Sequence, residues 1–337
     1  MKSLSARLTL TAAVLALAAH AGPAAAEVSE VKIAQQFGIS YLPLMYMENQ
    51  KLLEKHAKAM GAGDVTVSWA KFAGGNVMNE ALLSGSLHFA SGGVGPLVNL
   101  WAKTKGNLDV KAVTAMNVMP LYLNTRNPDV KSLKDFTAKD KIALPAVKVS
   151  IQAVTLQMAA AKEFGEDKFD ALDKFTVSMK HPDGMAALLS EASEITAHFT
   201  SPPFQYQQLE DPKVHRVLSS YDVLGGPATF NVIWTTSKFR EENPKVYAAF
   251  LKAFEEAVAE INRDKSAAAD NYIKWAKFKG SKDLLMKILN DPDVAFTMTP
   301  NNTTKYSDFL YKIGTIKVKP ESWKDLFFPE IHHLPGS

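Results

Sequence analysis

The chain has 337 residues, with 38 lysines and arginines against 35 aspartates and glutamates, and no cysteine. The balanced charge offers no massed basic surface and so argues against nucleic-acid binding. A chain without cysteine has neither a disulfide framework nor a lipidated cysteine. A hydrophobic fraction of 47% over this length is enough for one large core or two medium ones.

The first 26 residues are predicted to be a secretory signal peptide. Lys2 and Arg7 supply a basic start, residues 8–19 form an apolar run, and residues 24–26 are alanines that suit a cleavage site. The run is short for a membrane span, which favours a cleaved leader over the alternative, an uncleaved anchor. We therefore expect an exported protein of the periplasm.

The first part of the mature chain alternates strands and helices. Strands are predicted at residues 31–37, 65–72 and 87–90. Helices are predicted to begin near Pro43, Asn76 and Pro96, and residues 91–95 (SGGVG) are predicted to form the turn before the last of these helices. Repeated strand, turn and helix units indicate a parallel sheet with crossover helices.

A second set of the same units follows. Residues 110–126 are too long and too broken by Pro120 for one strand, so the chain is predicted to leave the first sheet here and enter a second. Further strands are predicted at 141–145, 174–180, 195–199 and 215–220, and helices after Ser150, from Met185 and near Phe204, with 181–184 (HPDG) as a turn. Residues 229–236 are predicted to cross back, and the chain is nearly all helical from Asn243 onward.

This order predicts an α/β protein with two lobes arranged as a clamshell. Each lobe is expected to be a mostly parallel sheet flanked by helices, and the two crossover strands are expected to form the hinge, about residues 116–122 and 226–232. The predicted division gives 27–118 to the first part of lobe I, 119–229 to lobe II, and 230–337 to the return to lobe I and the C-terminal helices.

The motif His-Phe-x-Ser occurs twice, beginning at His88 and at His198. In each predicted lobe it stands at the end of the third strand of the strand–turn–helix series. In open parallel sheets, ligands bind beyond the carboxyl ends of the strands, where helix N-termini point outward. The turns after the two copies are therefore predicted to face one ligand across a cleft. The two histidines themselves lie inside the strand pattern and are interpreted as core residues.

Several long stretches resemble one family of proteins. They include VKIAQQFGISYLPLMYMENQKLLEK (31–55), FAGGNVMNEALLSGSLHFA (72–90) and LYLNTRNPDVKSLKDFTAKDKIALP (121–145). In this order they resemble the periplasmic substrate-binding proteins of ABC importers in the nitrate, sulfonate and taurine class, which are related to the thiamine-pyrimidine precursor binding fold. The resemblance implies two α/β lobes that close by a hinge on a small solute and deliver it to the permease and ATPase of the inner membrane. We expect a monomer with no cofactor, metal or catalytic residue.

The candidate solute-binding residues lie at strand ends and on the return crossover. From lobe I the set is Gln36, Phe37, Ser40, Tyr41, Phe72, Gly74, Gly75, Asn76, Ser91, Gly92 and Gly93. From lobe II and the return crossover it is Lys148, Ser150, Thr200, Ser201, Pro202, Tyr206 and Asn231. The resemblance implies that Gln36, Phe37, Ser40 and Tyr41 form the first ligand-binding loop of the family.

The charged residues near these turns limit the chemical classes of solute that the site is expected to bind. The mature chain has four arginines, and none lies in the candidate turns: Arg126, Arg216, Arg240 and Arg263. A bidentate arginine anchor is therefore not expected. Lys148 and backbone N–H groups are left to hold a monoanion such as a sulfonate, whereas the aromatic residues favour an apolar or aromatic body.

Enzyme signatures are absent from the sequence. There is no G-x-S-x-G nucleophile elbow, and GGVG at 92–95 lacks the spacing of a dinucleotide fingerprint. Two alternatives remain open at this stage. One is an enzyme of the same fold, similar to the thiamine-pyrimidine synthases, although their chemistry depends on a cysteine-rich motif that this chain lacks. The other is an exported sensor that signals when it closes.

Overall fold

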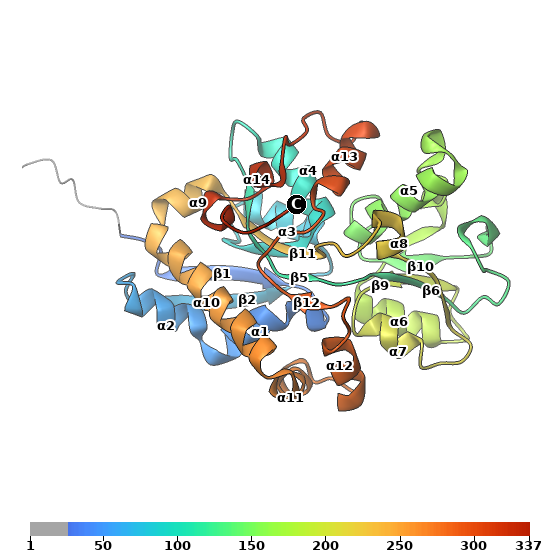
Figure 1. Cartoon of the computed structure of the whole chain (residues 1–337), viewed down its shortest axis with the longest axis horizontal. Helices are drawn as coiled ribbons and strands as arrows, with labels where there is room; N and C mark the ends of the chain where they lie inside the picture. Colours follow the sequence, from blue (N-terminus) through green and yellow to red (C-terminus); the bar gives the residue numbers. More distant parts are fainter. Residues whose placement is uncertain (1–25) are drawn as a thin grey trace, which may run out of the picture.

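Two β-sheets lie side by side, each covered by helices, and the chain passes between them through extended segments (Figure 1). The computed structural model describes residues 26–337. The predicted signal peptide therefore lies outside the described residues except for Ala26. Within 26–337, no helix is both long enough and apolar enough to cross a membrane.

The sheet of the first lobe is built from two hydrogen-bonded groups of strands. In spatial order its strands are β2 (Thr66–Lys71), β1 (Glu30–Gln35), β3 (Ala90–Gly93), β11 (Asn231–Thr235) and β4 (Lys111–Ala115). β1 and β2 are parallel, and a parallel bridge between Ile33 and Phe89 joins them to β3. The return strand β11 runs antiparallel to both β3 and β4.

Helices cover both faces of this sheet. They are α1 (Leu42–Gln50), α2 (Leu52–Ala59), α3 (Gly75–Leu83), α4 (Val94–Thr104), α9 (Ser237–Glu242), α10 (Pro244–Arg263) and α11 (Lys265–Ala276). The helix predicted from Pro43 is divided because Lys51 adopts a left-handed conformation with φ 54°. The division lets α1 and α2 each pack against α10.

The second lobe repeats the topology of the first. Its strands, in spatial order, are β8 (Thr176–Ser178), β7 (Ile142–Leu144), β9 (Ala197–Thr200), β6 (Tyr122–Thr125) and β10 (His215–Ser219). Its helices are α5 (Ile151–Phe164), α6 (His181–Leu189), α7 (Phe204–Gln208) and α8 (Ser220–Leu224). Both sheets therefore have the same strand order in space. The order runs from the second parallel strand through the first and third to the crossover strand, and it ends with one further strand.

The two His-Phe-x-Ser copies occupy matching positions in this repeat. β3 pairs with the crossover strand β11, and β9 pairs in the same sense with the crossover strand β6. His198 is fully buried within β9, and His88 stacks on Phe239 with 4.8 Å between the ring centroids. The interpretation of His198 as a core strand residue is confirmed, whereas His88 stands just before β3 and is only half-buried.

Two predicted turns are wrong. Residues 91–93 continue strand β3, because Gly92 and Gly93 pair with β11, and helix α4 begins directly at Val94. Residues 181–184 are the first turn of helix α6. Proline is tolerated there because the first N–H groups of a helix have no partner inside the helix.

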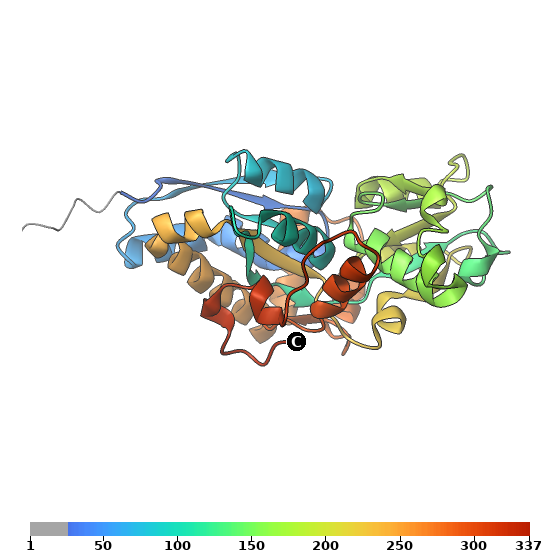
Figure 2. The same cartoon turned by 90° about the horizontal axis from the view of Figure 1, so that it is seen from above.

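The C-terminal part of the chain runs beside the boundary between the lobes (Figure 2). Its elements are α12 (Lys282–Leu289), β12 (Ala295–Phe296), α13 (Thr304–Lys312) and α14 (Trp323–Leu326). β12 pairs antiparallel with β5 (Asn117–Val118), which lies in the first crossover. This third extended segment at the hinge was not predicted from the sequence.

A pair of buried asparagines joins the two crossovers. The backbone N–H of Asn231 donates to the side-chain oxygen of Asn117 at 3.2 Å, and the Asn117 amide donates to the carbonyl of Ser40 at 2.8 Å and, at 3.4 Å, to the side-chain oxygen of Asn231. Both side chains are fully buried. Buried amides of this kind stabilise a fold only while all partners are present, because an unpaired polar group keeps its desolvation cost.

We predict that Asn117→Ala destabilises the protein by about 1–3 kcal/mol, because it leaves the carbonyl of Ser40 and the backbone N–H of Asn231 without their partner. Urea unfolding measures this change. The matched control is Asn49→Ala on the exposed side of α1, expected to change stability by less than about 0.5 kcal/mol. Equal midpoints for Asn117→Ala and Asn49→Ala would contradict the assignment.

Candidate functional site

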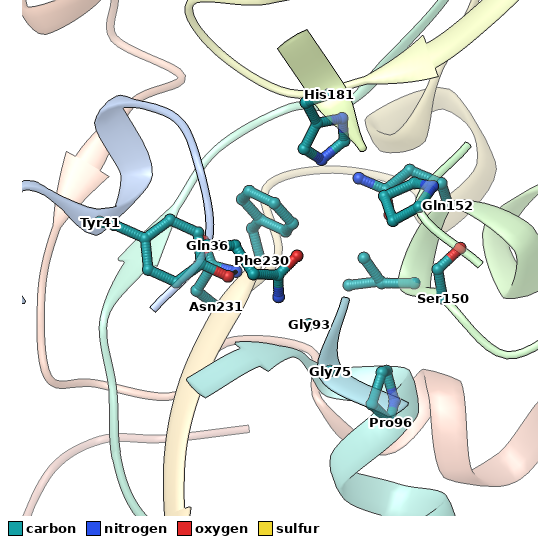
Figure 3. A pocket seen from close by; sticks show the side chains of 12 residues that line it. Gln36, Tyr41, Gly75, Gly93, Pro96, Ser150, Gln152, His181, Phe230 and Asn231 are labelled. Carbon is teal, nitrogen blue, oxygen red and sulfur yellow. Dashed lines mark hydrogen bonds between the residues drawn. The ribbon is translucent and has the colours of Figure 1, made fainter. Parts of the chain in front are cut away.

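A small cavity lies where the carboxyl ends of the strands of the two lobes meet. Lobe I and the return crossover line it with Gln36, Tyr41, Gly75, Gly93, Pro96, Phe230 and Asn231. Lobe II lines it with Pro145, Ser150, Ile151, Gln152 and His181. Figure 3 shows these residues around one space, with His181 and Gln152 opposite Tyr41 and Gln36.

The cavity volume is about 10 Å³, which is room for about one water molecule. The lobes touch closely around it. A Cβ atom on Gly93 would lie 2.5 Å from Cβ of Ile151 in the other lobe, and the backbone N–H of Ile39 donates to the carbonyl of Pro202 at 3.3 Å. The structure therefore has the clamshell closed, and a solute enters only if the lobes separate.

Lobe I supplies amide and hydroxyl groups. Gln36 donates through Nε2 to the carbonyl of Ser91 at 3.4 Å. The hydroxyl of Tyr41 accepts a hydrogen bond from Asn231 at 3.1 Å, which leaves the proton of that hydroxyl free for a group in the cavity. Burial raises the pKa of Tyr41, so the hydroxyl is neutral.

Lobe II supplies the amino end of helix α5. Ser150 caps this helix, because its hydroxyl accepts from the backbone N–H of Ala153 at 3.2 Å. Gln152 is 2% exposed and lines the cavity, and its Nε2 has no hydrogen-bond partner among residues 26–337. A buried N–H group without a partner is costly, so this amide is suited to an acceptor that enters the cavity.

His181 closes the lobe II side of the cavity at the amino end of helix α6. Its Nδ1 lies 2.8 Å from the hydroxyl of Thr200, and its ring stacks on Phe204 with 5.7 Å between centroids. Burial lowers the pKa of His181 to about 3, and burial and the neighbouring His181 hold the pKa of His198 well below its usual value. The imidazole of His181 is therefore neutral at physiological pH and offers one polar nitrogen without charge.

Helix N-termini provide the remaining electrostatic field. Four helices of nine or more residues begin at cavity residues or directly beside them: α3 at Gly75, α4 at Val94, α5 at Ile151 and α6 at His181. The N-terminus of a helix carries a partial positive charge and free N–H groups. Among the described residues, no charged side chain lines the cavity, so these helix dipoles favour electron-rich groups there.

The structure brings part of the predicted set to the cavity. The members that line it are Gln36, Tyr41, Gly75, Gly93, Ser150 and Asn231. The members that do not line it are Phe37, Ser40, Phe72, Gly74, Asn76, Ser91, Gly92, Lys148, Thr200, Ser201, Pro202 and Tyr206. Contact with a solute stays a prediction for the first group.

Some predicted members support the cavity wall from behind. The hydroxyl of Ser91 donates to the carbonyl of Ala34 at 2.5 Å, and the hydroxyl of Thr200 is engaged by His181. Both hydroxyls are used within the fold. Gly92 lies against Gln36, because a Cβ atom there would be 3.0 Å from Nε2 of Gln36.

Other predicted members lie at the contact between the lobes or on the surface. Ser40 and Ser201 are fully buried, and their hydroxyls have no partner within 26–337. Lys148 is exposed, so it does not supply a cation to the cavity. The hydroxyl of Tyr206 donates to Asp291 at 3.1 Å, away from the cavity. Their sequence positions follow strand ends, but these residues do not line the cavity.

Sequence reasoning missed a second group of cavity residues. They are Pro96, Pro145, Ile151, Gln152, His181 and Phe230. The strand-end rule contained the signal for two of them, since Gln152 and His181 stand in the first turns of helices that follow parallel strands β7 and β8. His181 was not predicted as a cavity residue because residues 181–184 were predicted to be a turn and not the start of a helix.

Comparisons with known proteins agree with this architecture. A model of the NMT1-like family matches residues 24–277. No curated protein matches the chain in sequence. Among solved structures, the alkanesulfonate-binding protein SsuA of Xanthomonas axonopodis pv. citri, bound to MOPS, is similar at 17% identity and a TM-score of 0.66, covering 86% of this chain and 94% of that one.

Two further structures are similar at comparable levels. The periplasmic nitrate-binding protein NrtA of Synechocystis PCC 6803 has 14% identity and a TM-score of 0.63, over 89% of this chain and 84% of that one. A Candida albicans protein described as having the generic periplasmic binding protein fold has 16% identity and a TM-score of 0.66, over 87% and 93%. The chain has the periplasmic binding protein fold, and the predicted two-lobed α/β class is confirmed.

We predict that Gly93→Ala keeps the lobes apart, because its Cβ atom would lie 2.5 Å from two carbon atoms of Ile151. Small-angle scattering without added solute should give a larger radius of gyration than for the parent protein. Gly95→Ala is the matched control, because its Cβ atom would meet Val154 at an ordinary 3.4 Å. An unchanged radius for Gly93→Ala would show that the contact does not limit closure.

We also predict that acid destabilises the protein through its buried histidines. His181 and His198 are neutral when folded, whereas an unfolded histidine takes up a proton below about pH 6.5. The stability that comes from keeping these histidines neutral is present above pH 6.5 and is lost as the pH falls toward 3. Between pH 7 and pH 5, His181 alone lowers the free energy of unfolding by about 2 kcal/mol. Thermal melts of the parent protein and His181→Gln should converge as the pH falls. Parallel pH profiles would contradict the prediction.

Proposed function

Because this chain belongs to the NMT1-like family, we propose that it is the solute-binding component of an ABC import system. It captures a small solute between its lobes and delivers the solute to a membrane permease and its ATPase. The protein acts as a monomer in the periplasm, where the predicted signal peptide would take it, and it releases the solute unchanged.

The observation that carries this proposal is the unpartnered amide of Gln152 in a polar cavity formed by both lobes. A group that bridges Gln152 in lobe II and Tyr41 or Asn231 in lobe I is bound only when the lobes are closed. Binding then stabilises the closed form by the difference in affinity between the two forms. That coupling is what a clamshell carrier requires.

The lining of the cavity suggests the chemistry of the solute. It offers carboxamides, hydroxyls, one neutral imidazole and four nearby helix N-termini, but no charged side chain from residues 26–337. This favours a small solute rich in oxygen acceptors, either uncharged or a monoanion held by N–H groups. Alkanesulfonate and nitrate, the ligands named for two of the similar structures, are monoanions of this kind. Phe230 adds one aromatic surface for an apolar part.

Admission of the solute requires a hinge motion, because the closed cavity holds about 10 Å³. The two crossovers are the segments that can bend, near residues 116–122 and 226–232. The lobes then rotate as units, and the Ile39–Pro202 hydrogen bond and the packing of Gly93 on Ile151 separate. We propose these segments as the hinge and the predicted boundaries near 118 and 229 as the limits of lobe II.

A thermal-shift screen tests the proposal across alkanesulfonates, nitrate, pyrimidines and aromatic acids. A solute present at one hundred times its dissociation constant raises the free energy of unfolding by about 2.7 kcal/mol. We expect at least one of these classes to raise the melting temperature. A screen in which no member shifts the melting temperature would remove support for this solute class.

For a solute found in this way, Gln152→Ala should weaken binding about fivefold to tenfold, because it removes one buried hydrogen-bond donor. Lys148→Ala should leave the affinity unchanged, because Lys148 is exposed and outside the cavity. Isothermal titration calorimetry measures both. The reverse pattern, loss of binding with Lys148→Ala alone, would place the solute at the surface loop and not in the cavity.

A further inference from the structure

Residues 291–306, which we call the strap, touch both lobes. The strap is anchored to lobe I and to the first crossover, since β12 pairs with β5 and the side chain of Asn262 on α10 donates to the carbonyl of Phe296 at 3.0 Å. It is also tied to the second crossover. Thr229 and Asn301 exchange two hydrogen bonds, one from the N–H of Thr229 at 2.9 Å and one to its hydroxyl at 2.8 Å.

The first end of the strap contacts lobe II through two tyrosines. The hydroxyl of Tyr206 on α7 donates to the carboxylate of Asp291 at 3.1 Å, and the hydroxyl of Tyr221 on α8 donates to the carbonyl of Asp293 at 2.8 Å. Both tyrosines are buried, and burial raises the pKa of each. Their hydroxyls therefore keep their protons and act as donors.

The second end of the strap contacts lobe II on helices α5 and α8. The hydroxyl of Tyr306 lies 3.3 Å from that of Thr155 on α5, with both residues fully or almost fully buried. The ammonium group of Lys305 donates to the carbonyl of Leu224 at the end of α8. In Figure 1 helix α12, which precedes the strap, and helix α13, whose first residues belong to it, lie on opposite sides of the crossovers.

We infer that the strap holds the two lobes closed in the absence of solute. A rotation of lobe II about the crossovers moves α5, α7 and α8 together, whereas the strap stays with lobe I. Such a rotation cannot preserve the contacts at both ends of the strap. Opening therefore breaks some of these hydrogen bonds, and their loss on opening biases the protein toward the closed form.

This bias has a consequence for binding. The apparent affinity of a carrier depends on the fraction of molecules in the state that binds. The empty closed form has room for about one water molecule. A strap that raises its fraction therefore lowers the fraction of molecules open to a solute and weakens the apparent affinity. It also assigns Tyr206 a role as a positioning residue between the lobes, in place of the solute contact predicted from its sequence position.

The test measures the distance between the lobes directly and needs no solute. Because the chain has no cysteine, Leu83→Cys in lobe I and Leu189→Cys in lobe II provide two unique labelling sites, 45% and 39% exposed. Each stands at the carboxyl end of a helix whose amino end lines the cavity. Spin labels at the two sites report the distribution of lobe separations by pulsed electron paramagnetic resonance.

We expect the labelled parent protein without solute to show mainly one short distance. Adding Tyr206→Phe and Tyr221→Phe should shift the population toward longer distances, by about fivefold for each hydroxyl removed. Tyr46→Phe is the matched control, because its buried hydroxyl accepts a hydrogen bond from Asn271 within lobe I. It should leave the distances unchanged.

Two results would overturn the inference. One is a distance distribution of the double tyrosine variant that coincides with that of the parent, and the other is an equal shift in the Tyr46→Phe control. The single variants are measured as well, so that instability of the double variant does not block the comparison. Since no solute is added, failure here leaves the proposed carrier function intact, and failure of the solute screen leaves this result intact.

Discussion

The reciprocal pairing of Asn117 and Asn231 fixes the place where the two crossovers meet, and the rest of the site is arranged around it. The same two side chains reach the carbonyl of Ser40 and the hydroxyl of Tyr41. One buried amide pair therefore sets the separation of the crossovers and orients the first loop of lobe I toward the cavity. Because both asparagines are fully buried, the loss of any one of these bonds leaves a buried polar group without its partner, which costs free energy.

The two lobes share one topology but contribute different things to the cavity. Lobe I offers Gly75 and Gly93 at its strand ends, which leave space, whereas lobe II offers Ile151, Gln152 and His181 at the equivalent helix starts. The missing side chains on one lobe make room for the side chains of the other. This division explains how the clamshell closes to a volume of about 10 Å³ without a clash, and why one added methyl group at Gly93 is a severe change.

The electrostatics of the cavity come from dipoles and not from ions. Four helices begin at or beside it, its histidine is held neutral by burial, and its other polar groups are amides and hydroxyls. A cavity of this kind attracts electron-rich groups through dipoles alone. No lysine or arginine then has to stay buried without a counter-charge while the cavity is empty. The cost falls instead on single unpartnered groups such as the amide of Gln152.

The sequence by itself determined the succession of strands and helices along the chain, the duplication marked by His-Phe-x-Ser, and the two crossovers. It also indicated three residues that line the cavity, Gln36 and Tyr41 after the first strand and Asn231 on the return crossover. Those features depend on local periodicity, on breakers and on the rule that parallel strands end at one edge of a sheet. Only the tertiary structure decided that Ser91 and Tyr206 point away from the cavity, that Gln152 and His181 point into it, and that the strap joins the lobes. The direction of a side chain at a strand end is set by which group of the opposite lobe or of a distant segment it meets, and no local pattern encodes a partner that lies 85 residues away, as Asp291 does from Tyr206.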